Sequence, residues 1–148
     1  MLAAVVILLV MVLVALSLNP SRQQFAWFMR LRRPAWLGFE RWIPLIWLLI
    51  YACFYASALL AWTASADPRL MAAYLLLLLL VQGYTWLICR TRRLANGTAI
   101  GFAGWVWGIA LAIALLPRAS TAALLLVPYL LGSPVGALVS WQMQRLNR

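Results

Sequence analysis

Five long apolar runs alternate with short polar segments along the chain. A helix needs roughly 20 apolar residues to cross the hydrocarbon core of a bilayer, and about 17 is the lower limit. Each run meets this length, and the segments between the runs hold nearly every charge and several helix-ending Pro, Gly and Asn residues. The pattern predicts an all-α integral membrane bundle of five transmembrane helices, forming a single domain over residues 1–148. The expected spans are about Leu2–Leu18, Ile43–Trp62, Leu70–Cys89, Ala99–Leu116 and Thr121–Met143.

The composition supports lipid as the solvent of most of the chain. Hydrophobic residues make up 67% of it and charged residues only 9%, a ratio that a soluble domain of this length could not bury in its core. The first run lacks a basic leading segment and a convincing cleavage site, so we expect a retained helix and not a signal peptide.

The charges indicate an orientation in the membrane. All twelve basic residues are arginines, and with five spans ten of them lie on one side, in the first connector, the third connector and the tail. Only Arg69 and Arg118 lie on the other side. Cytoplasmic loops of membrane proteins are enriched in basic residues, so we expect an outside amino terminus and a cytoplasmic carboxyl terminus, in the inner membrane of a cell. Nucleic acid is not an expected partner, because the arginines occupy short connectors between apolar runs.

Candidate catalytic groups are scarce. The chain has no histidine and only two acids, Glu40 and Asp67, so neither a carboxylate pair, a Ser-His-Asp arrangement nor a metal cluster can be assembled. Cys53 and Cys89 lie in apolar stretches, where cysteine usually acts as a small hydrophobe. Hydrolytic chemistry is therefore not expected.

Small residues at a spacing of four indicate close helix packing. Helix association in lipid depends on such stripes. We favour packing within one bundle, and a homodimer seam is the alternative use of either stripe. Pro128 and Pro134 should bend the last helix and free backbone carbonyls that need partners inside the bundle. The two stripes are Gly104, Gly108 and Ala112, and Gly132, Gly136 and Ser140.

Polar and aromatic positions inside the spans suggest a ligand site. Gln82 is the only strongly polar side chain deep in a span, and an amide in hydrocarbon should face the bundle interior. Trp47 and Tyr51 stand four residues apart on one helix face. Packing alone and a ligand pocket both remain open as explanations of these aromatic residues.

Two blocks of the sequence carry a resemblance to a known family. The first contains Trp27-Phe28, then Arg33-Pro34-Ala35-Trp36, then Trp47 to Tyr51; the second contains Val127-Pro128-Tyr129-Leu130 and ends with Arg145 and Asn147. These blocks resemble the signature of the tryptophan-rich sensory protein and translocator protein family, also called TspO/MBR or peripheral benzodiazepine receptors. The chain departs from the family pattern at Leu37-Gly38-Phe39, where the family usually has two prolines.

The resemblance implies a five-helix bundle, often dimeric, that binds tetrapyrroles or other flat hydrophobic ligands beneath the connector after the first helix. No cofactor is required, and porphyrin or haem is the expected kind of ligand. Aromatic faces suit a planar macrocycle, and arginines suit its anionic propionates. We therefore expect pocket walls from Trp36, Trp47, Tyr51 and Tyr129, a polar contact from Gln82, and rim charges from Arg32, Arg33 and Arg41.

Three alternatives to a receptor remain. A structural or scaffolding subunit would use the small-residue stripes to dock partner helices. A porphyrin transporter is a second alternative, although proton-coupled export normally needs a titratable group inside the membrane. An enzyme that degrades bound porphyrin is a third, and the residue types neither require nor exclude it.

Overall fold

The computed structural model describes all 148 residues, and every regular element in it is helical. The long helices correspond to the apolar runs, while two short elements form the connector after the first run. The elements are α1 (Leu2–Ser17), α2 (Arg22–Met29), the 3₁₀ turn η1 (Glu40–Trp42), α3 (Ile43–Ser65), α4 (Pro68–Thr91), α5 (Leu94–Leu115), α6 (Ser120–Leu125) and α7 (Val127–Leu146).

The number of spans depends on the first helix. Four helical segments are long and apolar enough to cross a membrane without help, the last of them being α6 and α7 together. The helix α1 has 16 residues, slightly fewer than a full crossing needs. It provides a fifth span if it is joined to α2, from which it is separated by a bend of 76°. The predicted all-α membrane bundle is confirmed. It has four spans, or five if α1 and α2 together form one.

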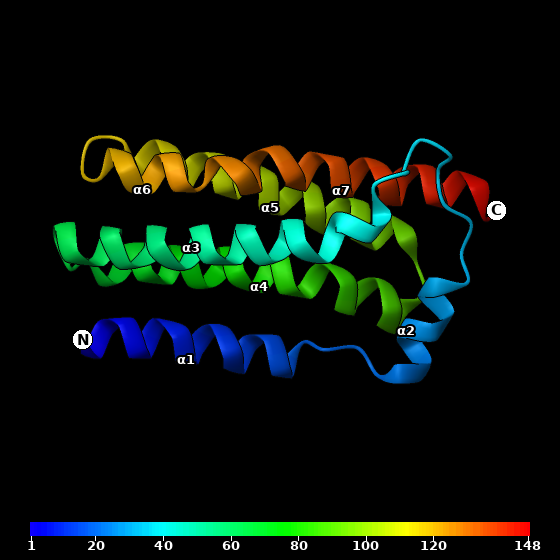
Figure 1. Cartoon of the computed structure of the whole chain (residues 1–148), viewed down its shortest axis with the longest axis horizontal. Coiled ribbons are helices and arrows are strands. Elements are labelled where there is room, and N and C mark those ends of the chain that lie inside the picture. Colours follow the sequence, from blue (N-terminus) through cyan, green and yellow to red (C-terminus); the bar gives the residue numbers. More distant parts are fainter.

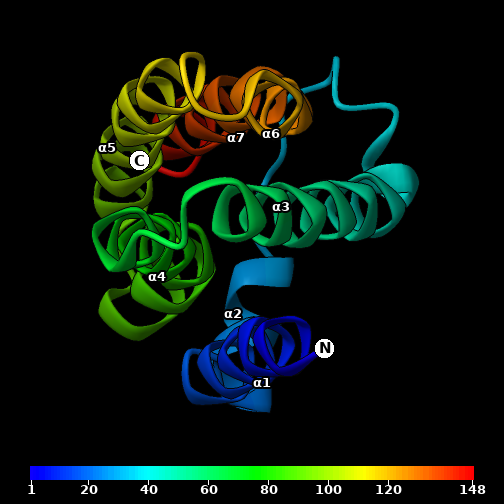
Figure 2. The same cartoon turned by 90° about the vertical axis from the view of Figure 1, so that its left-hand side faces the viewer.

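The helices form a ring. Helix α1 contacts α3 and α4, α3 contacts α6 and α7, α7 packs on α5, and α5 packs on α4. Figure 2 shows α1 beside α3 and α4 and well away from α5 and α7. In Figure 1 the connector after α1, the link between α4 and α5, and the carboxyl terminus lie at the same end of the molecule. The fold therefore gathers ten of the twelve arginines at that end, which we call the basic end.

The closest packing in the ring joins α5 to α7. Gly104 and Gly108 are buried on α5, and the Tyr129 side chain of α7 lies across both. A Cβ atom added to Gly104 would come within 2.7 Å of the Tyr129 hydroxyl, and one added to Gly108 within 2.8 Å of the Tyr129 ring. A stripe of small residues thus admits a large side chain from the neighbouring helix. Both glycines of this stripe therefore pack against a helix of the same chain.

The second small-residue stripe also faces neighbours within the chain. A Cβ atom on Gly132 would lie 3.1 Å from Ile50 of α3, and one on Gly136 would lie 3.9 Å from the Tyr84 hydroxyl of α4. Both glycines of α7 therefore contribute to the inner surface of the ring.

The two prolines of the last span act differently. Near Pro128 the helix is interrupted at Leu126, so the single helix expected over Thr121–Met143 is divided into α6 and α7. Pro134 lies inside α7, where its missing N–H leaves the Leu130 carbonyl without its usual partner. The indole N–H of Trp105 donates to that carbonyl at 3.0 Å. The freed carbonyl thus finds a partner from α5, as expected for backbone inside a membrane.

Replacing Gly108 by alanine should destabilise the bundle, because the added methyl group would overlap the Tyr129 ring. We expect a loss of about 1–3 kcal/mol, typical of an overpacked core, seen as a lower midpoint of thermal unfolding in detergent. Gly38→Ala is the matched control, since no atom lies within 4 Å of the added Cβ there. Equal midpoints for the two variants would contradict this account of the contact between α5 and α7.

Candidate functional site

A cavity of about 460 Å³ lies between the end of α1, the start of α2, and the facing sides of α3 and α4. We call it the aromatic cavity. It is placed toward the basic end, where the turn from α1 to α2 covers it. The residues that line it are Ala15, Leu18, Asn19, Pro20, Arg22, Phe25, Trp47, Tyr51, Val81, Gln82, Tyr84 and Thr85.

Trp47 and Tyr51 form the wall contributed by α3. They are one helical turn apart, and their ring centroids lie 6.0 Å from each other with an angle of 37° between the ring planes. Both side chains are half-buried and border the cavity. The two rings offer an extended apolar surface suited to the face of a flat ligand.

Gln82 of α4 borders the aromatic cavity and is half-buried, in agreement with the expectation that it faces the bundle interior. Its amide makes no hydrogen bond within the protein. It is also not sealed off, because no buried side-chain nitrogen or oxygen in the chain lacks a partner. Gln82 therefore offers a free donor and acceptor to whatever occupies the cavity.

Tyr129 is more deeply buried than Trp47 and Tyr51. This buried side chain borders a narrow recess of about 20 Å³ that shares Trp47, Val81 and Tyr84 with the aromatic cavity. Trp47 borders both spaces, whereas Tyr51 borders only the aromatic cavity and Tyr129 only the recess. Residues of α3 and α7 do converge on the bundle interior, but Tyr129 forms the rear of the site and not its main wall.

Tyr84 borders the site, although it was not among the ligand-binding residues expected from the sequence. Its hydroxyl donates to the Gly136 carbonyl at 2.8 Å and is hydrogen-bonded to the Ser140 hydroxyl, so it joins α4 to α7. It borders both the aromatic cavity and the recess. The stripe that contains Gly136 and Ser140 indicated a closely packed neighbour, and it did not indicate which residue that is.

Trp36 does not belong to this cavity. It lies in the connector, 44% exposed, and its indole N–H donates to the Gln142 side chain of α7 at 2.5 Å. Trp36 therefore does not line the cavity that Trp47 borders. The physical reason is that the connector runs back across the outside of α7, whereas Trp47 points into the ring.

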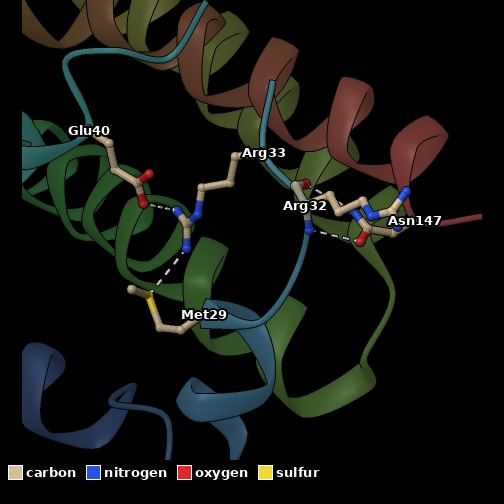
Figure 3. A network of polar contacts seen from close by, with 5 residues as sticks. All are labelled: Met29, Arg32, Arg33, Glu40 and Asn147. Carbon is tan, nitrogen blue, oxygen red and sulfur yellow. Dashed lines mark hydrogen bonds and ion pairs between the residues drawn. The ribbon is translucent and has the colours of Figure 1, made fainter. Parts of the chain in front are cut away.

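The contacts of the three arginines expected at the rim lie outside this cavity. Figure 3 shows Arg33 paired with Glu40 and donating to the Met29 sulfur, and the backbone of Arg32 bound to Asn147. The Asn147 side chain accepts from the Arg32 N–H at 2.9 Å and donates to the Arg32 carbonyl at 3.0 Å. Arg41 lies over the ring of Trp42. None of the three borders the aromatic cavity.

Arg22 takes the position expected for those arginines. It is the only charged residue that borders the aromatic cavity. A capping box places it there: the Ser21 hydroxyl accepts from the Gln24 N–H at 3.3 Å, and the Gln24 side chain accepts from the Ser21 N–H at 3.0 Å. The Ser-x-x-Gln spacing is visible in the sequence, and it could have located the start of α2 and hence Arg22.

These features define a polytopic helical membrane protein with an aromatic, partly polar cavity inside its bundle. A protein-family model described as the TspO/MBR family matches residues 3–146, and the chain belongs to that family. No curated protein matches the sequence. Membership of the family supports a general role as a membrane sensor, receptor or transporter.

Proposed function

We propose that this protein is a membrane receptor or sensor that binds tetrapyrroles, of the porphyrin or haem type, or similar flat hydrophobic ligands in the aromatic cavity. The observation that carries the proposal is the cavity itself. Its volume of about 460 Å³ falls within the roughly 300–1,000 Å³ typical of small-molecule sites. Its lining combines an aromatic wall with a few polar groups, which is the usual composition of such sites.

Each side of the cavity suits one part of a porphyrin. The rings of Trp47 and Tyr51 can pack against the apolar face of the macrocycle, and the free amide of Gln82 can bind a polar group at its edge. Arg22 can pair with a propionate carboxylate. The chain holds no acid that competes for Arg22 at this site, because Glu40 pairs with Arg33 and Asp67 accepts from the backbone at the start of α4.

A receptor is favoured over a proton-coupled transporter because no acid lies in the interior of a span. Glu40 precedes α3 and Asp67 precedes α4, so both acids are at helix ends. A receptor is favoured over a purely structural subunit because Gln82 and Arg22 present unpaired polar groups to a cavity.

We further propose an outside amino terminus and a cytoplasmic carboxyl terminus, in the inner membrane. The collection of ten arginines at the basic end supports this orientation. The aromatic cavity would then lie toward the cytoplasmic side.

Trp47→Ala should weaken the binding of protoporphyrin IX roughly tenfold or more, because it removes the central aromatic wall. Trp36→Ala should leave the affinity within about twofold, since the Trp36 indole is bound to Gln142 outside the cavity. The measurement is a titration followed by porphyrin absorbance, with circular dichroism to confirm that both variants remain folded. Equal affinities for the two folded variants would exclude Trp47 from the site.

Arg22→Gln should weaken protoporphyrin binding about fivefold at low salt, the range expected of a solvent-accessible ion pair, and less at high ionic strength. The dimethyl ester of the same porphyrin, which has no carboxylate, should bind the variant and the unaltered protein alike. Arg41→Gln is the matched control, because that arginine lies over Trp42. A loss of ester affinity equal to that of the free acid would show that Arg22 does not bind a carboxylate.

The orientation can be tested with single cysteines in a background carrying Cys53→Ala and Cys89→Ala. A membrane-impermeant maleimide applied to intact cells should label Ala66→Cys, in the turn between α3 and α4, and should not label Arg148→Cys. After the cells are broken, Arg148→Cys should be labelled as well. The reverse pattern in intact cells would invert the proposed orientation.

A further inference from the structure

A second cavity lies beside the same three helices, at the opposite end of α1. Its volume is about 560 Å³, and we call it the apolar groove. The residues that border it are apolar except for Tyr74, whose hydroxyl is 2.6 Å from the Ser57 hydroxyl and hydrogen-bonded to it, and Trp62, which carries an indole N–H. Apart from the Trp62 indole at one end, the groove therefore offers no free polar group, and its chemistry suits a hydrocarbon chain.

The groove is long. Its wall on α1 extends from Leu2 to Met11, and its wall on α4 from Pro68 to Leu78. At 1.5 Å per helical residue, each wall is roughly 15 Å long. This shape suits an extended chain better than a planar ring.

The groove exists because α1 packs only loosely against its neighbouring helices. No residue of α1 is buried. The only side-chain hydrogen bond between α1 and the other helices is that from the Tyr55 hydroxyl to the Ala4 carbonyl, at 3.3 Å. Space between α1 and its neighbours is thus left for a molecule from the surroundings.

We propose that the apolar groove holds one acyl chain of a membrane phospholipid. Lipid chains are the molecules that surround these spans, and moving a chain from bilayer to groove exchanges one apolar environment for another. Packing against the fixed walls of α1, α3 and α4 then provides the net attraction, as it does between helices in lipid.

Charge at the end of the groove complements the phosphate of the same lipid. Arg69 is exposed and lies one helical turn before Ala72, which borders the groove. Its guanidinium forms no ion pair, since Asp67 accepts from the Arg69 backbone N–H and the chain's one salt bridge joins Arg33 to Glu40. Trp62 borders the same end and is of the residue type that favours the lipid headgroup region.

This site goes beyond the proposed function and does not depend on it. The two cavities share α1, α3 and α4 but have no residue in common. One is polar and aromatic at the basic end, and the other is apolar at the opposite end. Loss of lipid from the groove and loss of porphyrin from the aromatic cavity can therefore be measured separately.

The test uses the full chain in vesicles of phosphatidylcholine with a small proportion of phosphatidylglycerol that carries a diazirine in the middle of one acyl chain. After illumination, labelled residues are mapped by mass spectrometry. We expect Met11 and Met71 of the groove to be labelled several-fold more than Phe102, an exposed residue of α5. Equal labelling of groove and Phe102 would show only general contact with lipid and would overturn the proposal.

Ala72→Trp should fill the groove and reduce the labelling of Met11 about fivefold or more. Ala103→Trp, on an exposed position of α5 that borders neither cavity, should leave it unchanged. A circular dichroism spectrum and a thermal midpoint equal to those of the unaltered protein would confirm that Ala72→Trp is folded. Labelling that persists in folded Ala72→Trp would place the acyl chain elsewhere and overturn the proposal.

The contact between Arg69 and the lipid phosphate can be tested in the same experiment. Arg69→Gln should lower the labelling of Met11 by this lipid about twofold, and unchanged labelling would overturn the assignment of the phosphate to Arg69.

A second copy of the chain is the competing occupant of the apolar groove. If Ala72→Cys, in the cysteine-free background, forms disulfide-linked dimers in the vesicles while the groove remains unlabelled, that occupant replaces the lipid.

Discussion

The contact of Tyr129 with the glycine face of α5 is the constraint on which the rest of the bundle depends. In lipid, helices gain little from burying apolar surface, so close packing and hydrogen bonds must hold them together. Gly104 and Gly108 let α7 approach α5 until a tyrosine ring lies directly on the backbone of α5. Hydrogen bonds inside the span reinforce the contact: Trp105 donates to the Leu130 carbonyl, and Ser133 donates to the Gly101 carbonyl at 3.2 Å.

The opposite side of the ring is held in a different way, and this difference creates the cavities. Ser57 joins three helices, because its hydroxyl donates to the Ala122 carbonyl of α6 at 2.6 Å and is bonded to Tyr74 of α4. Helix α1 has no comparable junction. The tightly packed α5 and α7 therefore serve as a rigid frame, while the space along α1 remains available for molecules that the chain itself does not provide. Both proposed ligands lie along that helix.

The arginines of the first connector are close together in the sequence but have different roles in the structure. Gln142 of α7 and Asn147, which follows α7, hold the connector at Trp36 and Arg32, and Glu40 pairs with Arg33. These residues fasten the connector to the outside of the ring. Arg22, brought to the cavity by the capping box of α2, is left as the arginine that can meet a ligand. Residues of one type in one connector are thus divided between anchoring and recognition.

The sequence by itself determined the helices, the membrane as their solvent, the family and the gathering of arginines at one end. These follow from the length of apolar runs, from glycine spacing and from local motifs, which act over a few residues. It also indicated that Gln82 faces inward, because an amide in hydrocarbon needs partners, and the family resemblance implied that Trp47 and Tyr51 are pocket walls. Only the tertiary structure decided that Trp36 binds Gln142 outside the ring, that Tyr84 reaches Gly136, and that Arg22 borders the cavity. Those outcomes depend on the path of a connector without regular periodicity and on contacts between residues far apart in the chain, and neither leaves a pattern in the local sequence.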